Sequence, residues 1–251
     1  MRNLDGSAHL YRIDELYRDE RLLVVNKPSG ISVHKGWDSD PVNLVKLVRR
    51  LTRRYVHPVH RLDRPTSGAL VFAFDSETAG LLQDHFRDKT IQKRYIALTR
   101  GVLEPEEVRI DHPVPRKPKG PRVDAVTRVR RLAVVEDRYS LVEYYPETGR
   151  LHQIRRHLKH LNHPIICDTR YGDGAENTRF REDFGLLRLA LHAIHIEFAH
   201  PHTGKMLQID APPPDDLRVP LERMGFKKED WQPVPPAAPE SPAESPAGPS
   251  V

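Results

Sequence analysis

A short polar segment, His60–Gly68 (HRLDRPTSG), contains the residue best placed to do chemistry, Asp63. The segment contains two turn-forming residues and directly precedes an apolar run, Ala69–Phe74, that predicts a buried strand. A carboxylate on a loop that is anchored to a rigid strand is a common arrangement for a catalytic group. The residues alone favour a structural role, in which the Asp63 side chain accepts hydrogen bonds from the backbone of Thr66 and Ser67 in a turn.

The cationic residues of the chain are unevenly distributed. Lys and Arg total 40 against 35 Asp and Glu, so the formal net charge is only +5. Residues 41–62 nevertheless hold six Lys or Arg and no acid, residues 149–167 hold four with four histidines and no acid, and the Pro-rich segment 112–123 holds four more. This segregation is typical of proteins that bind a polyanion such as a nucleic acid. Solvated helix faces on an ordinary basic protein would give the same pattern.

Composition excludes several classes of protein. No segment approaches the roughly 18 apolar residues of a membrane span, and the polar N-terminus lacks the apolar core of a signal peptide. The single cysteine, Cys167, allows neither a disulfide framework nor a cysteine-rich zinc site. We therefore expect a soluble, cytoplasmic protein. Residues 233–251 hold 7 of the 23 prolines and no aromatic residue, which predicts a disordered tail. The remaining chain is expected to form an N-terminal extension over 1–13 and one folded domain over 14–232.

The hydrophobic pattern predicts a mixture of strands and helices. Strands are predicted at Leu22–Asn26, Ala69–Phe74, Tyr95–Leu98, Val123–Val135 and Tyr139–Tyr145, with a hairpin formed by Leu189–Phe198 and Lys205–Ile209. Helices are predicted at Val42–Leu51, after the capping residue Asp75, over the apolar stripe Leu151–Leu161, and at about Pro214–Met224. Because the strands and helices do not alternate strictly, we expect an α+β domain.

The segment HRLDRPTSG resembles the signature of the RluA family of pseudouridine synthases, and further segments agree with that family in order. DERLLVVNKPSGI (19–31) resembles the opening strand and NKP-x-G turn, and KRYIA (93–97) resembles the K-x-Y-x-A motif. TGRLHQIRRH (148–157) resembles the GR-x-HQIR-x-H motif, and LHA (191–193) with HPHTG (200–204) resembles the closing motif. Together these segments lie within residues 14–209, nearly all of the predicted folded domain.

The resemblance implies an isomerase that needs no cofactor and no metal, built on the family's catalytic domain with a mixed, largely antiparallel central sheet. It implies that Asp63 is the catalytic aspartate and that Arg155 is its cationic partner. It also implies that Tyr95 packs against the target base and is the candidate for removing the proton from C5, and that Leu191 belongs to the base pocket. The residues alone would favour a core position for Tyr95 and a phosphate contact or surface position for Arg155.

The resemblance further implies that the target uridine is flipped out of an RNA stem, at a cost of a few kcal/mol for unstacking. The family's arginine at the position of Arg61 inserts into the gap that the base leaves. Other RNA contacts are expected from His60, Arg64, Lys93, His152 and Arg156. In the histidine-rich segment His152–His163 only His157 and His160 have a close helical spacing, so no metal site is expected there.

Details of the motifs resemble a branch of the family that modifies a uridine in the T-arm stem of tRNA, at position 65 in tRNA numbering. These details are Arg64-Pro65 in the signature, Arg156 after the motif arginine, and the stretch 163–193. With the opening strand expected near Leu22, there is no room for the S4-type RNA-binding domain that many ribosomal members carry. We therefore expect a monomeric enzyme that acts on tRNA, with no obligatory protein partner and no membrane contact.

Three alternatives remain open at this stage. The chain could be a synthase of the same family that acts on ribosomal RNA, because one sequence does not display the surfaces that select an RNA. It could be a non-catalytic RNA-binding module of the same fold, which would bind tRNA without turnover. It could also be a ribonuclease that uses His57 and His60, which would cleave the strand.

Overall fold

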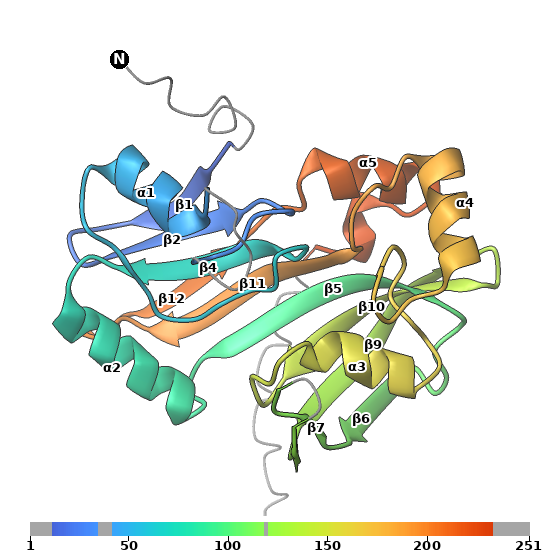
Figure 1. The fold of residues 1–251 in the computed structure, drawn as a ribbon, viewed down its shortest axis with the longest axis horizontal. Helices are drawn as coiled ribbons and strands as arrows, with labels where there is room; N and C mark the ends of the chain where they lie inside the picture. The colour runs from blue at the N-terminus through green and yellow to red at the C-terminus, as the bar shows by residue number, and fades with distance from the viewer. Residues whose placement is uncertain (1–11, 35–41, 118–119, 233–251) are drawn as a thin grey trace, which may run out of the picture.

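The computed structural model describes residues 12–34, 42–117 and 120–232, which form a central sheet of ten strands (Figure 1). The strand order is β1-β2-β4-β11-β5-β10-β9-β6, with β12 paired to β11 and β3 paired to β4. Every pair is antiparallel except β4 with β11, so the expected mixed, largely antiparallel sheet is confirmed. The strands are β1 (Asp14–Arg18), β2 (Leu22–Lys27), β3 (His57–Pro58), β4 (Ser67–Ala73), β5 (Gln92–Arg100), β6 (Glu107–Asp111), β9 (Val126–Val135), β10 (Tyr139–Pro146), β11 (Leu191–Ala199) and β12 (Met206–Asp210).

Helices pack on both faces of this sheet. Among the described residues they are α1 (Leu44–Thr52), α2 (Ser76–Arg87), α3 (Gln153–His160), α4 (Gly174–Phe184) and α5 (Asp215–Arg223), with a 3-10 turn at Lys228–Asp230. Alternate residues of β2 point to opposite faces, so Leu23 and Val25 pack with α1 whereas Leu22 and Val24 pack with α2. The core of the other half of the sheet contains residues of α3, α4 and α5. A small separate ribbon is formed by β7 (Val114–Pro115) and β8 (Arg122–Val123).

The two halves of the sheet are joined where β4 and β11 run parallel for only two residue pairs. His192 pairs with Ser67, and Ala193 pairs with Gly68. Gly68 has a positive φ of 121°, and a Cβ at this position would overlap the backbone of Ala193. Glycine is therefore required here, because only glycine allows both the backbone conformation and the close approach. This contact places the loop that contains Asp63 beside the start of β11.

Many predicted elements are confirmed. The Asp75 side chain caps α2 by accepting a hydrogen bond from the backbone N–H of Thr78. Pro214 and Met224 are the two capping positions of α5, and the predicted hairpin is present as β11 and β12. These elements carry strong local signals, since a capping residue or a turn fixes where the apolar pattern begins and ends.

Other expectations are wrong or incomplete. The sheet does not begin near Leu22, because β1 precedes β2; β1 is a polar edge strand, and its sequence DELYR carries no alternating apolar signal. The strand β6 lies at the opposite edge and was not predicted either, although its short sequence EVRID alternates between polar and apolar residues. The helix α4 was not predicted because its sequence GAENTRFREDF has few apolar residues. The predicted strand Val123–Val135 is divided into β8 and β9, and the apolar stripe Leu151–Leu161 extends beyond both ends of α3.

Two expectations about the termini fall largely outside the described residues. These are the tail over 233–251 and the N-terminal extension over 1–13, of which only residues 12 and 13 are described. In the part of the chain that the structure describes, no helix is both long enough and apolar enough to cross a bilayer.

We expect two glycine substitutions to change the free energy of unfolding in opposite directions. Gly68→Ala should lower it by about 3 kcal/mol or more, because the methyl group would overlap Ala193 and the positive φ would be strained. Gly80→Ala, in α2, should raise it by roughly 0.5–1 kcal/mol, because nothing lies within 4 Å of the added Cβ. Chemical denaturation measures both changes, and an undiminished stability of Gly68→Ala would contradict the close approach of the two strands.

Candidate active site

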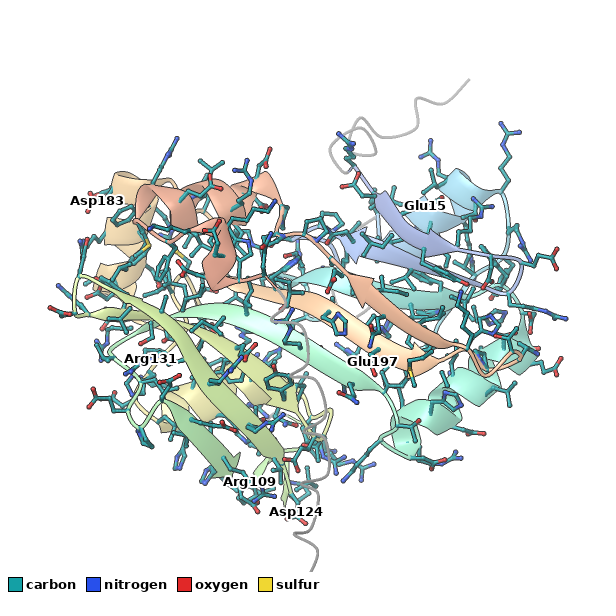
Figure 2. All side chains as sticks on the ribbon, turned by 180° about the vertical axis from the view of Figure 1, so that it is seen from behind. Glu15, Arg109, Asp124, Arg131, Asp183 and Glu197 are labelled. Carbon is teal, nitrogen blue, oxygen red and sulfur yellow. The ribbon has the colours of Figure 1, made fainter. Side chains whose placement is uncertain are left out.

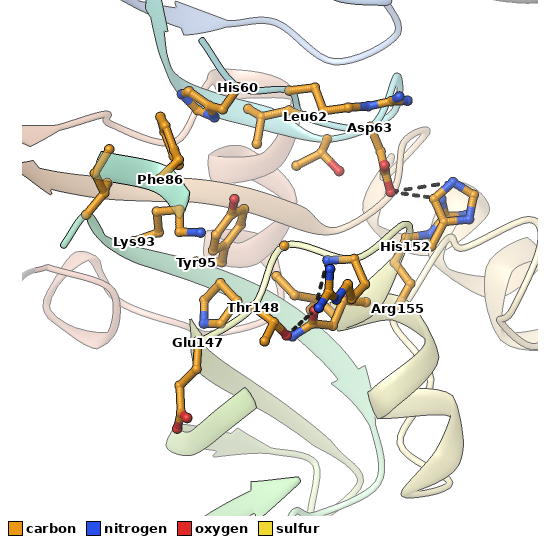
Figure 3. Close-up of a pocket in the computed structure, with 18 of the residues that line it drawn as sticks. His60, Leu62, Asp63, Phe86, Lys93, Tyr95, Glu147, Thr148, His152 and Arg155 are labelled. Carbon is orange, nitrogen blue, oxygen red and sulfur yellow. Dashed lines mark hydrogen bonds and ion pairs between the residues drawn. The ribbon is translucent and has the colours of Figure 1, made fainter. Parts of the chain in front are cut away.

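A cavity of about 730 Å³ lies where the loop before β4, the end of α2, β5 and the start of α3 meet (Figure 3). Asp63 lines it from the loop, Tyr95 from β5 and Arg155 from α3. Eight of the ten side chains that the sequence predicts for the site lie in its lining, and Arg64 and Arg156 are the two that do not. Residues far apart in the sequence are thus brought to one site.

The Asp63 side chain forms an ion pair with Arg155. The Nη1 atom of Arg155 donates to Oδ2 of Asp63 at 3.3 Å, and no described residue bonds Oδ1 of Asp63. The backbone carbonyl of Asp63 accepts the N–H of Thr66 at 3.0 Å. A turn is therefore present, but the backbone closes it and the carboxylate is directed to the arginine.

Arg155 is held in place by a second carboxylate, that of Asp168. Nε and Nη2 of Arg155 donate to the two oxygens of Asp168, each at 2.8 Å. Oδ1 of Asp168 also accepts the backbone N–H groups of Arg170 and Tyr171 at 2.9 and 3.0 Å. Both side chains are buried, with exposed fractions of 7% for Arg155 and 0% for Asp168. A bidentate pair of this kind fixes the plane of the guanidinium.

Asp168 and Arg155 each favour the ionised form of the other. Burial alone would raise the pKa of Asp168, but the hydrogen bonds and charge of Arg155 and the two backbone N–H groups lower it. Burial alone would lower the pKa of Arg155, but Asp168, and after it Asp63, raise it. Both groups therefore stay ionised at neutral pH, and Arg155 presents a fixed positive charge to Asp63.

His152 also faces Asp63, but as a neutral ring. Burial, partly opposed by Asp63, lowers the pKa of His152 to about 4. The hydroxyl of Tyr171 accepts from Nε of Arg156 at 3.1 Å and can therefore donate its own proton to Nδ1 of His152, 3.0 Å away. This pattern leaves the proton of the ring on Nε2, which lies 3.8 Å from Oδ2 of Asp63. His152 thus presents an N–H group and no charge to the carboxylate.

One wall of the cavity contains Tyr95 and Lys93 (Figure 3), and Leu191 also lines the cavity. Burial, and then the charge of Asp63, raise the pKa of Tyr95, so its phenol is protonated at neutral pH. Burial also lowers the pKa of Lys93, whose ammonium lies 5.7 Å from the centre of the Phe86 ring. Leu191 is 3% exposed. The wall offers an aromatic ring, a cation and an apolar surface to a planar ligand.

The three arginines that the sequence predicts as RNA contacts differ in their surroundings. Arg61 is exposed at the cavity and makes no hydrogen bond to a described residue. Arg64 is exposed outside the lining, and its Nε donates to the carbonyl of Gly30 at 3.0 Å. Arg156 is half-buried and donates to the hydroxyl of Tyr171 and to the carbonyl of Pro115. Arg61 is thus the arginine of this set that is open to a ligand at the cavity.

The two histidines considered for a ribonuclease are not arranged for acid–base catalysis. Nε2 of His60 accepts the backbone N–H of Val71 at 3.0 Å, and burial, with a smaller effect of Lys93, lowers the pKa of His60 to about 3. The ring of His57 lies 4.8 Å from that of Tyr55 and is not part of the cavity. His60 is therefore a neutral ring fixed to β4, and the geometry gives no support to a ribonuclease.

The loop that contains Asp63 is held from one side by Lys27. Its ammonium donates to the carbonyls of Pro28, Arg64 and Thr66 at 2.9, 3.2 and 2.7 Å. Three acceptors match the three protons of the charged form. Lys27 is fully buried, and burial, with a smaller effect of Arg188, lowers its pKa to about 7. The buried amino group of Lys27 thus gives the loop hydrogen bonds that a strand would obtain from its neighbours in a sheet.

The same loop is held from the other side by Arg188. Its Nη1 donates to Oγ of Ser67 at 2.8 Å, and its Nη2 donates to the carbonyl of Leu191 at 2.8 Å. Nε2 of His192 donates to the carbonyl of Ala211 at 2.8 Å. Because burial lowers the pKa of His192 to about 3, the ring is neutral, and its Nδ1 accepts from the hydroxyl of Ser67 at 2.7 Å. This chain of hydrogen bonds ties the loop to β11.

Sequence reasoning missed three residues that position the site, Asp168, Lys27 and Arg188. Lys27 and Asp168 lie within segments that were compared with the family, but no role was assigned to either. Arg188 is the single charge in the apolar run Leu186–Leu191. A lone charged residue in such a run indicates a buried charge that must have partners, and this signal could have identified it.

The histidine-rich segment has a structural role around α3. Nδ1 of His157 lies 2.9 Å from Oγ1 of Thr127, and Nε2 of His157 lies 2.9 Å from the carbonyl of His112. The ring of His160 stacks on that of His112, with 3.7 Å between the ring centres. Among the described residues, no three His, Cys, Asp or Glu side chains are grouped so that they could hold a metal ion.

Comparisons with known proteins identify relatives of the chain. The sequence pattern of the RNA pseudouridylate synthase family matches residues 21–160, a range that includes Asp63, Tyr95 and Arg155. The tRNA pseudouridine synthase C of Haemophilus ducreyi is 41% identical over 221 residues, which cover 79% of this chain and 90% of the relative. The protein of the same name from Salmonella typhimurium is 40% identical over 238 residues, which cover 86% of this chain and 91% of the relative.

The fold is also similar to that of two solved human proteins. Human RNA pseudouridylate synthase domain containing 4 is 27% identical with a TM-score of 0.70, and the similarity covers 84% of this chain and 92% of the human one. Human RNA pseudouridylate synthase domain containing 1 is 26% identical with a TM-score of 0.70, covering 86% and 89%. The shared sequence pattern, the relatives and the common fold show that this chain belongs to the RNA pseudouridylate synthase family, whose members are isomerases.

Proposed function

We propose that this protein isomerises a uridine of tRNA to pseudouridine, and that the target lies in the T-arm stem at position 65. The names of the relatives support tRNA as the substrate class, and the motif details around Arg64-Pro65 and Arg156 support the T-arm. The observation that carries the proposal is the ion pair between Asp63 and Arg155 on the wall of a cavity that can hold a nucleotide.

The reaction defines what the site must supply. Pseudouridine formation breaks the bond between N1 of uracil and C1′ of the ribose, forms a bond from C5 to C1′, and leaves a proton on N1 in place of the proton lost from C5. Substrate and product contain the same atoms, so no oxidant, reductant or water is consumed. The site needs a carboxylate, a surface that holds uracil while it turns, and a path for one proton.

We assign the catalytic role to Asp63, in its ionised form. Its side chain is 18% exposed, and its Oδ2 is engaged by Arg155. Oδ1, which no described residue bonds, is available to the substrate. Because Asp168 fixes Arg155, the carboxylate of Asp63 is already oriented before RNA binds. A group that is held in its reactive geometry in advance lowers the barrier to reaction.

Tyr95 and Leu191 are proposed to hold the uracil ring, and Tyr95 also to transfer the C5 proton. The raised pKa of Tyr95 means that its phenol begins the reaction protonated. It can accept the C5 proton only if its own proton leaves at the same time. N1 of uracil must gain a proton once its bond to C1′ is broken. N1 is therefore the group that can accept the phenol proton of Tyr95.

The RNA around the target base is proposed to contact cations at the cavity. Arg61, exposed and without a described partner, is suited to stack in the gap that the flipped base leaves. Lys93 is suited to contact the base or a phosphate, and His60 and His152 offer uncharged rings to the RNA. Action as a monomer is part of the proposal, and a tRNA substrate supports a cytoplasmic location.

We expect Asp63→Asn to abolish pseudouridine formation while tRNA binding is retained. The amide is isosteric with the carboxylate but cannot act as nucleophile or base, so turnover should fall by at least roughly 10⁴-fold. Release of tritium from tRNA labelled at uridine C5 measures turnover. Asp183→Asn, at an exposed carboxylate of α4, is the matched control and should keep full activity. A turnover of Asp63→Asn close to that of the parent would rule out the assigned role.

We expect Asp168→Asn to lower kcat by roughly 10- to 100-fold with KM for tRNA nearly unchanged. The amide oxygen can still accept from the backbone of the 170–171 turn, but the charge that holds Arg155 is lost. Because Asp168 is fully buried, it cannot contact RNA directly, so a change confined to KM would contradict a positioning role. Steady-state kinetics on a tRNA transcript separate the two parameters.

The RNA target is tested with tRNA transcripts that differ at one nucleotide. A transcript with uridine at position 65 should gain one pseudouridine there, and a transcript with cytidine at that position should gain none. Mapping by carbodiimide modification and primer extension locates the product. Pseudouridine at another tRNA position would refute the T-arm assignment, and turnover of ribosomal RNA fragments without turnover of tRNA would favour the ribosomal alternative.

A further inference from the structure

A surface patch that is not part of the cavity lies at the C-terminal end of α1. It consists of Leu51 and Tyr55 with Arg49, Arg50 and Arg53, and is named here the Tyr55 patch. Leu51 is 48% exposed and Tyr55 is 61% exposed. They are two of only five large hydrophobic residues that are exposed in the described parts of the chain, and they lie four positions apart. Exposed apolar residues that are rimmed by polar ones are typical of a surface that contacts a partner.

The Tyr55 ring is arranged as a platform. The guanidinium carbon of Arg49 lies 3.8 Å from the ring centre and covers one face. The ring of His57 lies 4.8 Å away at an angle of 60°, so it does not stack flat on Tyr55. With 61% of the residue exposed, the remaining face is open to solvent. A planar ligand can therefore stack on Tyr55 with the arginine beneath it.

The segment that carries the platform is strongly basic. Arg50 and Arg53 are exposed and form no hydrogen bond or ion pair with any residue in the described ranges. Arg53 caps α1 in the left-handed conformation, with a φ of 55°. Residues 41–62 contain no acid, so the sequence of this segment contributes no negative charge. A partner with phosphate groups and exposed rings matches this chemistry better than a protein surface does.

The patch lies within reach of an RNA stem whose target base occupies the cavity. The chain from Tyr55 continues through β3 to Arg61, which lines the cavity. In Figure 1 this connection runs from α1 down one side of the molecule and then across the front of the sheet. Six residues span at most about 20 Å. In a duplex each strand carries a phosphate about every 3.4 Å along the axis, so this distance corresponds to about six nucleotides.

We propose that the Tyr55 patch is a second RNA-binding site, which stacks one unpaired base of the substrate on Tyr55 while Arg50 and Arg53 contact the neighbouring phosphates. The proposal rests on the proposed function, because the same RNA occupies both the cavity and the patch. Base stacking on an aromatic ring tolerates any sequence. The patch thus contributes affinity, and it does not select the reacting base.

The test measures binding of a fluorescently labelled tRNA transcript at several salt concentrations. Tyr55→Ala should weaken binding by about 5- to 150-fold, and Tyr55→Phe, which keeps the ring, should bind like the parent. The double variant Arg50→Ala with Arg53→Ala should lower the slope of log affinity against log salt by about 1.4 to 1.8. Turnover at saturating tRNA should be unchanged in all three, because none of these residues lines the cavity.

Matched controls lie on the far half of the molecule. Arg181→Ala removes an exposed cation of α4, and Leu187→Ala removes a hydrophobic residue that is 77% exposed. Both should leave the affinity and the salt slope unchanged. If Tyr55→Ala and the double arginine variant bind tRNA as tightly as the parent at every salt concentration, or if Arg181→Ala weakens binding equally, the proposal is wrong. If the parent binds tRNA but does not turn it over, the proposed function fails while the binding experiment still decides the role of the patch.

Discussion

The buried guanidinium of Arg155, held between two carboxylates, is the interaction on which the site depends. Removing three charges from water is costly, and such a cluster is stable only when every member is well bonded. Asp168 meets this condition, because it accepts both Nε and Nη2 of Arg155 and two backbone N–H groups. The guanidinium therefore has one orientation, and its remaining nitrogen faces Asp63. The carboxylate of Asp63 is directed by a pair of residues that need not touch the RNA.

The loop with Asp63 must be rigid, although it has no partner strand. Lys27 and Arg188 supply the missing hydrogen bonds by donating to carbonyls and to Ser67. Gly68 then allows β4 to approach β11 closely enough for the two halves of the sheet to join. The carboxylate, the arginine and the cavity wall with Tyr95 come from different parts of the chain, and this join fixes their separation.

The positive charge around the cavity comes from arginine and lysine and not from histidine. Burial lowers the pKa of His60 to about 3 and that of His152 to about 4, so both rings are neutral at physiological pH. These two histidines therefore add no attraction for RNA that changes between pH 6 and 8. A net charge of +5 is modest, and its effect depends on position: exposed cations at Arg61 and in the Tyr55 patch lie along one connected segment, on the approach to the cavity.

The sequence by itself determined the elements with strong local signals and the position of the signature loop. The cap at Asp75, the limits of α5 and the buried strand after Gly68 depend on neighbouring residues, and so does the short segment that contains Asp63. Only the tertiary structure showed where that carboxylate is directed, because Arg155, which donates to it, lies 92 positions away. The polar edge strand β1 and the roles of Asp168, Lys27 and Arg188 were likewise not predicted from the sequence. The spacing of apolar residues along the sequence indicates which face of an element is apolar. The pairing of buried charges depends instead on which elements the fold brings together.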